Sequence, residues 1–214
     1  MILPEEKTWL SSPLSSRLKL GLFPLAPHLS RVSMSDRYLR QTMIPEIGPE
    51  GQKRLQQSSV LCIGTGGLGS PAALYLAAAG VGTLGLIDPD TVSESNLHRQ
   101  ILHGTEDVGK EKLDSARSRL HSINPEVQII SHQGRFTAHN AVDLVAQYDV
   151  VLDGSDNFPT RFAASDACVL TKTPLVHGAV DRFEGQFTVF APHLGGPCYR
   201  CLLPELPPEG MVPT

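Results

Sequence analysis

The feature that most restricts the fold of this chain is the glycine-rich stretch GTGGLGSP at residues 64–71. It follows the apolar run VLCI and precedes the alanine-rich run AALYLAAAG, which have the composition of a strand and a helix. Gly64, Gly66 and Gly69 form the pattern G-x-G-x-x-G, and Asp88 ends the next apolar run, 19 residues after Gly69. This arrangement is typical of a nucleotide-binding unit, in which backbone N–H groups meet phosphate and the acid binds ribose hydroxyls.

Downstream of this unit, short apolar runs alternate with helical patterns. The predicted strands are VLCI, LGLI, VQII, DVVLD and PLVHG. Helices are predicted over residues 67–79, over 112–123 before an Asn-Pro pair, near 141–147 and near 160–172. This order predicts an α/β fold: a Rossmann-like, doubly wound, mostly parallel sheet with helices on both faces and the ligand at the carboxyl ends of the strands. The run GQFTVFAP predicts the start of an antiparallel extension.

Composition excludes several classes of partner. The chain has 214 residues, of which 41% are hydrophobic, and a formal net charge of −4. This charge provides no basic field for nucleic acid or for an anionic membrane. The longest nearly apolar stretch, residues 74–87, is too short for a membrane span. We therefore expect a cytoplasmic protein with neither a nucleic-acid partner nor a membrane partner.

Residues 1–33 differ from the rest of the chain because they are rich in Leu, Ser and Pro without clean periodicity. We expect a disordered extension, or a start of translation upstream of the true one at Met34. An organellar transit peptide is the alternative, which Glu5 and Glu6 oppose. Residues 34–214 are then the folded domain.

Polar residues follow the second predicted strand, in the stretch DPDTVSESNLHRQILH. Asn96, Arg99 and Gln100 arrive together beside the expected nucleotide crevice, and Lys112 begins the next helix. Two cations suit a triphosphate better than a hydride donor. The structural alternative is a solvated charged face, which is the usual outcome for a run of charges.

Two carboxylates follow the fourth predicted strand, in the stretch DGSDNFPTR. Asp153 and Asp156 would repel a bound phosphate unless a metal ion lay between them, so Asp156 is interpreted as a magnesium ligand. The alternative is that Asp156 only caps the next helix. Spacing alone leaves both interpretations open.

The four cysteines fall into two groups. Cys62 and Cys168 lie in apolar strand-like and helix-like contexts, where buried thiols are common. Cys198 and Cys201 form the motif CYRC, and free thiols are their simplest interpretation.

Seven motifs, in order, carry a resemblance to a known family. They are RYLRQ, GTGGLGSP, DPDTVSESNLHRQ, VGKEK, DGSDNFPTR, FEGQFTVF and CYRC, spread from about residue 36 to residue 214. Together they closely resemble the MoeB/ThiF adenylyltransferases, relatives of the ubiquitin-activating enzymes. The resemblance implies ATP-dependent adenylation of the C-terminal glycine of a ubiquitin-like sulfur carrier ending in Gly-Gly, of the molybdopterin synthase or thiamine type. It also implies magnesium as a cofactor and a homodimer.

The resemblance also assigns roles to particular residues. Asp156 matches the family's essential carboxylate, through which magnesium is positioned, and Arg40 matches an arginine that crosses to the partner subunit's ATP. The implied nucleotide-binding set is Gly64, Gly66, Gly67, Gly69, Asp88, Asn96, Arg99, Gln100, Lys112, Asp156 and Asn157. The implied catalytic set is Arg40, Asn96, Arg99, Lys112 and Asp156.

The sequence departs from the family pattern at its C-terminal end. Cys198 and Cys201 match the first half of a structural zinc site whose second CxxC lies further along in the family, so zinc would need ligands beyond this chain; His193 is a weak candidate third ligand. We therefore expect an incomplete domain with an exposed sheet edge and an exposed apolar face. The alternative function is a catalytically silent, truncated nucleotide-binding fragment or partner subunit. A nicotinamide oxidoreductase is a weaker third interpretation.

Overall fold

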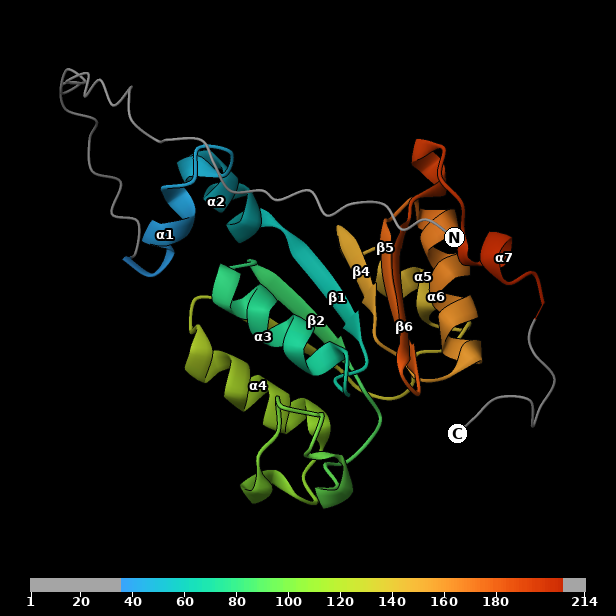
Figure 1. Cartoon of the computed structure of the whole chain (residues 1–214), viewed down its shortest axis with the longest axis horizontal. Helices are drawn as coiled ribbons and strands as arrows, with labels where there is room; N and C mark the ends of the chain where they lie inside the picture. The colour runs from blue at the N-terminus through green and yellow to red at the C-terminus, as the bar shows by residue number, and fades with distance from the viewer. Residues whose placement is uncertain (1–35, 206–214) are drawn as a thin grey trace, which may run out of the picture. The chain divides into compact units, whose positions relative to one another are not determined.

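The computed structural model describes residues 36–205, and a six-stranded sheet with the order β3-β2-β1-β4-β5-β6 forms its centre (Figure 1). The strands are β1 (Ser59–Ile63), β2 (Thr83–Ile87), β3 (Gln128–His132), β4 (Val150–Asp153), β5 (Leu175–Asp181) and β6 (Glu184–Phe190). Neighbouring strands from β3 to β5 are parallel, and β6 pairs antiparallel with β5. The predicted doubly wound sheet with an antiparallel extension is confirmed.

Helices cover both faces of this sheet (Figure 1). The α-helices are α1 (Leu39–Thr42), α2 (Gly48–Gln57), α3 (Gly69–Ala79), α4 (Lys112–Ile123), α5 (Ala141–Val145), α6 (Phe158–Thr171) and α7 (Tyr199–Leu202). Short 3-10 helices are η1 (Asp36–Tyr38), η2 (Glu94–Asn96), η3 (Thr105–Asp107) and η4 (Pro192–Leu194). The side chains of β1 alternate between two cores: Val60 and Cys62 pack with α3 and α4, whereas Leu61 and Ile63 pack with α5 and α6. Burial on both faces explains why this strand is apolar throughout.

The order in which the chain adds strands to the sheet reverses between the parallel neighbours β1 and β4. From β1 the chain continues to β2 and β3 on one side, and then returns to β4 on the other. The loops after β1 and β4 therefore diverge and leave a crevice at the carboxyl ends of the strands. This crevice is where the glycine-rich stretch and the stretch DGSDN meet.

Tyr38 anchors the segment before α2 to the rest of the domain. Its ring is 1% exposed, and its hydroxyl donates to Glu126 Oε2 at 2.9 Å and accepts from Asn124 Nδ2 at 2.7 Å. A Cβ at Gly80 would lie only 2.5 Å from the Tyr38 ring, so the glycine makes room for it. The tyrosine of RYLRQ is thus a packing residue.

The β5–β6 hairpin is the most exposed part of the sheet. Phe183 and Phe187 are almost fully exposed, and Val180 and Val189 are more than half exposed. The expected apolar face and sheet edge are therefore present among the described residues. No helix between residues 36 and 205 is long and apolar enough to cross a membrane. The prediction for residues 1–33 lies outside the described residues.

Candidate functional site

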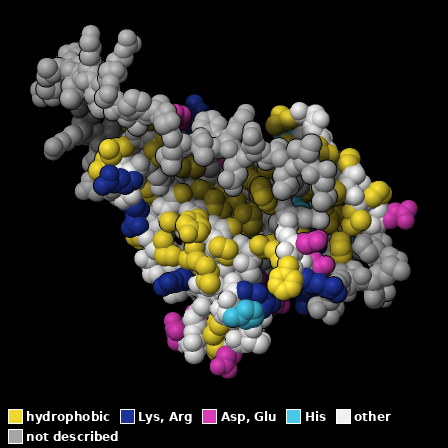
Figure 2. All heavy atoms as spheres, in the orientation of Figure 1, with side chains coloured by type: hydrophobic (Ala, Val, Ile, Leu, Met, Phe, Trp, Pro, Cys, Tyr) yellow, Lys and Arg dark blue, Asp and Glu magenta, His cyan; other side chains and the backbone are white. Residues whose placement is uncertain are grey.

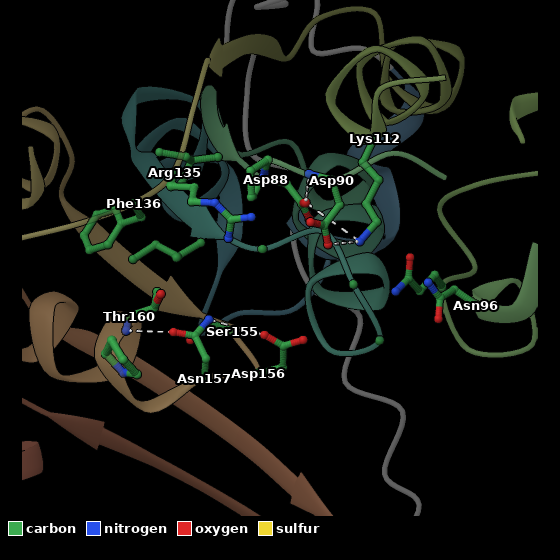
Figure 3. A pocket seen from close by; sticks show the side chains of 18 of the residues that line it. Asp88, Asp90, Asn96, Lys112, Arg135, Phe136, Ser155, Asp156, Asn157 and Thr160 are labelled. Carbon is green, nitrogen blue, oxygen red and sulfur yellow. Dashed lines mark hydrogen bonds and ion pairs between the residues drawn. The ribbon is translucent and has the colours of Figure 1, made fainter. Parts of the chain in front are cut away.

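A cavity of about 590 Å³ opens at the carboxyl ends of the strands (Figure 3). The side chains labelled in Figure 3 surround it and come from the loops after β2, β3 and β4 and from the starts of α4 and α6. Of the residues predicted from the sequence, those that line it are Gly64, Gly66, Gly67, Asp88, Asn96, Arg99, Gln100, Lys112, Asp156 and Asn157. The fold therefore brings together nearly all of the predicted nucleotide-binding set.

The glycine-rich loop follows β1 directly and is tightly packed. Gly64 has a φ of 86°, a backbone conformation that side chains with a Cβ rarely adopt. A Cβ at Gly69 would lie 2.0 Å from the Gly64 carbonyl oxygen, so this position also excludes a side chain. Gly69 does not line the cavity itself; it lets the first turn of α3 approach the loop, whose Gly66 and Gly67 face the cavity.

Asp88 is held in place by the loop beside it. Its carboxylate is 5% exposed, and Oδ2 accepts from the Thr65 N–H at 2.8 Å and from the Thr65 hydroxyl at 2.9 Å. Oδ1 accepts from the Asp90 N–H at 3.0 Å. This carboxylate fixes the glycine-rich loop and also lines the cavity.

Lys112 is a buried cation at the start of α4. Its ammonium group lies 2.9 Å from Asp90 Oδ2 and 3.8 Å from Asp88 Oδ1 (Figure 3). A buried ammonium ion next to carboxylates is stabilised by them and is oriented before any ligand arrives. It is therefore a preset positive charge on the wall of the cavity.

The remaining polar residues of this region are held less tightly. Arg99 is exposed, and its closest polar contact is His98 Nε2 at 3.4 Å. The Gln100 side chain is 5% exposed, yet its Oε1 has no hydrogen-bond partner among the described residues. A buried amide oxygen without a partner is costly, and Gln100 is one of the residues that line the cavity.

The structure separates two roles that the sequence left open at DGSDN. Asn157 is the residue that caps α6, because its Oδ1 accepts from the Thr160 N–H at 3.0 Å. Within the described part of the chain, Asp156 makes no capping bond, and its side chain accepts a hydrogen bond from Asn157 Nδ2 at 3.3 Å. The interpretation of Asp156 as a helix cap is therefore wrong, and its exposed carboxylate is available to a ligand in the cavity.

Several cavity residues were not predicted from the sequence. They are Pro89, Asp90, Arg135, Phe136, Thr137, Ser155, Pro159 and Thr160, together with the apolar strand ends Ile63 and Ile87. Arg135 and Phe136 follow β3, whose carboxyl end meets the same edge as β1 and β2. The parallel arrangement itself was the signal that would have identified them.

Comparison with known proteins agrees with this geometry. The sequence of residues 38–214 matches the ThiF family. The chain belongs to the ThiF family. It is 51% identical over 202 residues to the probable adenylyltransferase/sulfurtransferase MoeZ of Mycobacterium tuberculosis, covering 92% of this chain and 52% of MoeZ. It is also 51% identical over 183 residues to the sulfur carrier protein adenylyltransferase of Thermus thermophilus, covering 84% of this chain and 68% of that protein. The chain thus spans about half the length of MoeZ.

Solved structures similar to this ThiF domain include Escherichia coli MccB with ATP, with a TM-score of 0.70 and 25% identity over 78% of this chain and 52% of MccB. A second is E. coli tRNA N6-threonylcarbamoyladenosine dehydratase, TcdA, with a TM-score of 0.64 and 29% identity over 70% of this chain and 66% of TcdA. Both confirm the fold of the ThiF domain.

Two predicted groups of the ThiF domain lie away from the cavity. Arg40 is exposed on α1 and does not line the cavity within this chain. Cys198 and Cys201 have their Sγ atoms 3.7 Å apart at the start of α7. Among residues 36–205, no group of three or more His, Cys, Asp or Glu side chains is placed to hold a metal, so His193 does not complete a site with the two cysteines.

The other two thiols are structural, as predicted. Cys62 is fully buried and Cys168 is 2% exposed. Burial raises the pKa of each thiol to about 12, so neither is a thiolate at neutral pH. The ThiF domain therefore offers no activated cysteine inside its described core.

His103 is a buried histidine beneath the glycine-rich loop of the ThiF domain. Its Nδ1 lies 2.9 Å from Ser115 Oγ, and the Ser115 hydroxyl donates to Asp107 Oδ2 at 2.8 Å. Because that hydroxyl proton is used, the imidazole must donate through Nδ1. Burial, the largest cause, lowers the pKa of His103. The Thr65 backbone raises this pKa and the Lys112 charge lowers it, both by smaller amounts.

Proposed function

We propose that this chain binds ATP in the cavity and adenylates the C-terminal glycine carboxylate of a ubiquitin-like sulfur-carrier protein, releasing pyrophosphate. The observation that carries the proposal is the charge arrangement opposite the glycine-rich loop. Arg99, a cation with no carboxylate partner within residues 36–205, and Asp156, a carboxylate with no cation partner there, line the same cavity as the preset cation Lys112. Hydride transfer needs no such group, whereas a reacting triphosphate does.

Names of relatives and neighbours support the nucleotide and the acceptor. The similar Thermus thermophilus protein is named a sulfur carrier protein adenylyltransferase, and the similar MccB structure contains ATP. Neither name distinguishes a molybdopterin-type carrier from a thiamine-type carrier. The acceptor is therefore proposed by its chemistry: a small protein that ends in a free glycine carboxylate.

The proposed reaction is a displacement at the α-phosphorus of ATP. A carboxylate oxygen of the carrier forms a bond to this phosphorus while the bond to the pyrophosphate oxygen breaks. Lys112 and Arg99, with the Asn96 amide, stabilise the charge that spreads over the phosphate oxygens, and Asp88 holds the ribose. The carrier supplies the nucleophile, so the high pKa of the buried thiols is no obstacle.

Magnesium fits the residues that are present. This ion keeps several waters and uses one or two carboxylates together with substrate phosphates, so it needs no cluster of protein ligands. Asp156, an exposed carboxylate on the cavity wall, is the residue that would hold it. When bound, magnesium supplies positive charge to the phosphates.

A second copy of the chain is proposed to complete the site with Arg40. On the described surface, Leu39 on α1, Met43 at the C-terminal end of α1 and Tyr75 on α3 are more than half exposed. Figure 2 shows hydrophobic side chains gathered over these two helices. An apolar helix face of this kind is normally covered. Two inactive variants, Arg40→Ala and Asp156→Ala, should regain activity when mixed, because one site of a mixed dimer has both residues.

The test of the proposed reaction is carrier-dependent exchange of labelled pyrophosphate into ATP with magnesium, using a panel of small carriers that end in Gly-Gly. We expect exchange with the wild-type chain and at least one carrier, and a reduction of roughly 10²- to 10³-fold in Asp156→Ala. Asp114→Ala is the matched control, because Asp114 is an exposed carboxylate on α4 outside the cavity. ATP binding without exchange for every carrier would contradict the proposal.

A further inference from the structure

Asp153 and His177 form a buried pair next to the nucleotide cavity without lining it. Their side chains are 1% and 2% exposed, and Asp153 Oδ2 lies 2.8 Å from His177 Nδ1. The two residues are direct neighbours across the parallel β4–β5 pairing. Burying such a pair has a desolvation cost, and the proposed reaction gives neither residue a chemical role. The pair is therefore a candidate for a structural role at the site.

The second oxygen of Asp153 holds the turn that carries Asp156. Oδ1 accepts from the Ser155 N–H at 3.0 Å and from the Ser155 hydroxyl at 2.6 Å. From the other side, Arg161 Nη2 donates to the Ser155 carbonyl at 3.1 Å. Ser155 and Asp156 both line the cavity, so the Asp153 carboxylate sets where this edge of the cavity lies (Figure 3).

The turn has little freedom against the glycine-rich loop. A Cβ at Gly154 would lie 3.0 Å from the Gly69 nitrogen, and a Cβ at Gly64 would lie 3.2 Å from the Gly154 carbonyl oxygen. Both glycines are needed for this close approach. A small displacement of Ser155 would therefore change the position of Asp156 relative to the phosphates that the loop is proposed to bind.

We propose that His177, acting through Asp153, is the positioning residue for Asp156; this inference rests on the proposed function. The bond from Nδ1 to Oδ2 fixes the rotation of the carboxylate, so that Oδ1 faces Ser155. The ring itself is oriented by Tyr199, with centroids 4.9 Å apart, and lines a second cavity of about 380 Å³. Residues at the end of the described chain thus set the geometry of the nucleotide site.

Two substitutions separate this role from simple packing. His177→Asn keeps an amide donor near the Nδ1 position, whereas His177→Leu fills the space without a donor and leaves Asp153 Oδ2 unpaired. In the exchange assay, His177→Leu should lower kcat by roughly 10- to 100-fold with little change in KM for ATP, since misplacing a catalytic group affects the transition state most. His177→Asn should retain most of the wild-type kcat.

Amide hydrogen exchange provides a readout that needs no activity. The Ser155 N–H, which donates to Asp153, should exchange faster in His177→Leu than in His177→Asn, and both should match the wild type in α4. If His177→Leu does not fold, Ser155→Ala replaces it, because it removes only the 2.6 Å hydroxyl bond and should lower kcat in the same direction. Equal kcat and equal Ser155 exchange in the two His177 variants would overturn the proposal. A wild-type chain inactive with every carrier would refute the proposed function, but the amide comparison would still test the positioning.

Discussion

Two sides of the nucleotide cavity differ in how their side chains are held. We call Asp88, Asp90 and Lys112 the fixed wall, because hydrogen bonds and ion pairs of 2.8–3.8 Å join them to one another and to Thr65 of the glycine-rich loop. We call Asn96, Arg99 and Asp156 the free wall: within residues 36–205 the side-chain hydrogen bonds of Arg99 and Asp156 are 3.3 Å or longer, and the Asn96 amide has none. The side chains of the fixed wall lose their conformational entropy during folding, whereas those of the free wall should lose it when a ligand binds.

Residues of the fixed wall should therefore report on stability, and residues of the free wall on the reaction. A substitution in the fixed wall breaks contacts that exist without ligand, so it should change folding and binding. A substitution in the free wall removes contacts formed with the ligand, so it should change rate with little effect on folding.

The largest effect is expected for Arg99→Ala in the free wall. Carrier-dependent exchange should fall by roughly 10²- to 10³-fold, because one donor to the developing charge is lost. The free energy of unfolding in urea should remain within about 0.5 kcal/mol of the wild type, as for other exposed side chains. Arg117→Ala, which removes an exposed arginine paired with Asp114 on α4, is the control that should change neither. A large loss of stability in Arg99→Ala would contradict the distinction between the fixed wall and the free wall.

A smaller effect is expected for Gly69→Ala, which acts on the loop of the fixed wall. The new Cβ would collide with the Gly64 carbonyl oxygen, which is backbone and cannot rotate away. We expect a loss of about 1–3 kcal/mol in the free energy of unfolding and weaker ATP binding. Gly185→Ala is the matched control, since the nearest atom to its Cβ would be 3.9 Å away. Calorimetry of ATP binding and urea unfolding measure the two quantities.

Asn157→Ala tests the boundary between the walls. This residue caps α6 and also lines the cavity. Loss of the cap should cost about 1 kcal/mol of stability. If Asn157 also binds nucleotide, ATP affinity should decrease as well; unchanged affinity would leave it with the cap alone.

The smallest effect concerns pH and the histidine beneath the fixed wall. Because burial lowers the pKa of His103, the unfolded chain takes up a proton at this residue more readily than the folded chain. Well above the ordinary histidine pKa of about 6.5, protonation of His103 therefore has no effect on the free energy of unfolding. As the pH falls through that value, protonation of His103 in the unfolded chain lowers the free energy of unfolding. Urea unfolding between pH 7.5 and 5.5 should show this decrease, and His103→Asn should reduce it. His132, whose pKa is also lowered by burial, contributes in the same direction. An identical pH dependence in wild type and variant would rule His103 out as a source.

Sequence alone predicted the sheet well, because its patterns are local. The runs VLCI and LGLI became β1 and β2, and the helix predicted over residues 67–79 begins two residues later, at Gly69, because the first glycines remain in the loop. The helix α2 was not predicted. It has few apolar residues, and its one fully buried side chain, Gln52, donates to the Ala79 carbonyl, a tertiary contact with no local signal.

The site was predicted where residues follow one strand closely, and missed where three-dimensional neighbours decide. Asp88 was selected from its spacing and Lys112 from the family resemblance, but the pairing of Lys112 with Asp90 was not predicted. The choice between cap and ligand for Asp156 depended on which of two adjacent side chains reaches Thr160, which spacing cannot determine. His177 gave no signal, because its importance comes from a partner 24 residues away in an adjacent strand.

The contrast between the buried and the accessible cysteines has a practical consequence. The chain has four cysteines, and Cys62 and Cys168 are shielded, with pKa values raised to about 12. A maleimide dye added to the native chain at neutral pH therefore reacts at Cys198 or Cys201, the intermediate and exposed thiols. Since Cys201 lines the second cavity beside His177, a fluorophore attached to Cys201 would be an optical sensor of that cavity, without any engineered cysteine.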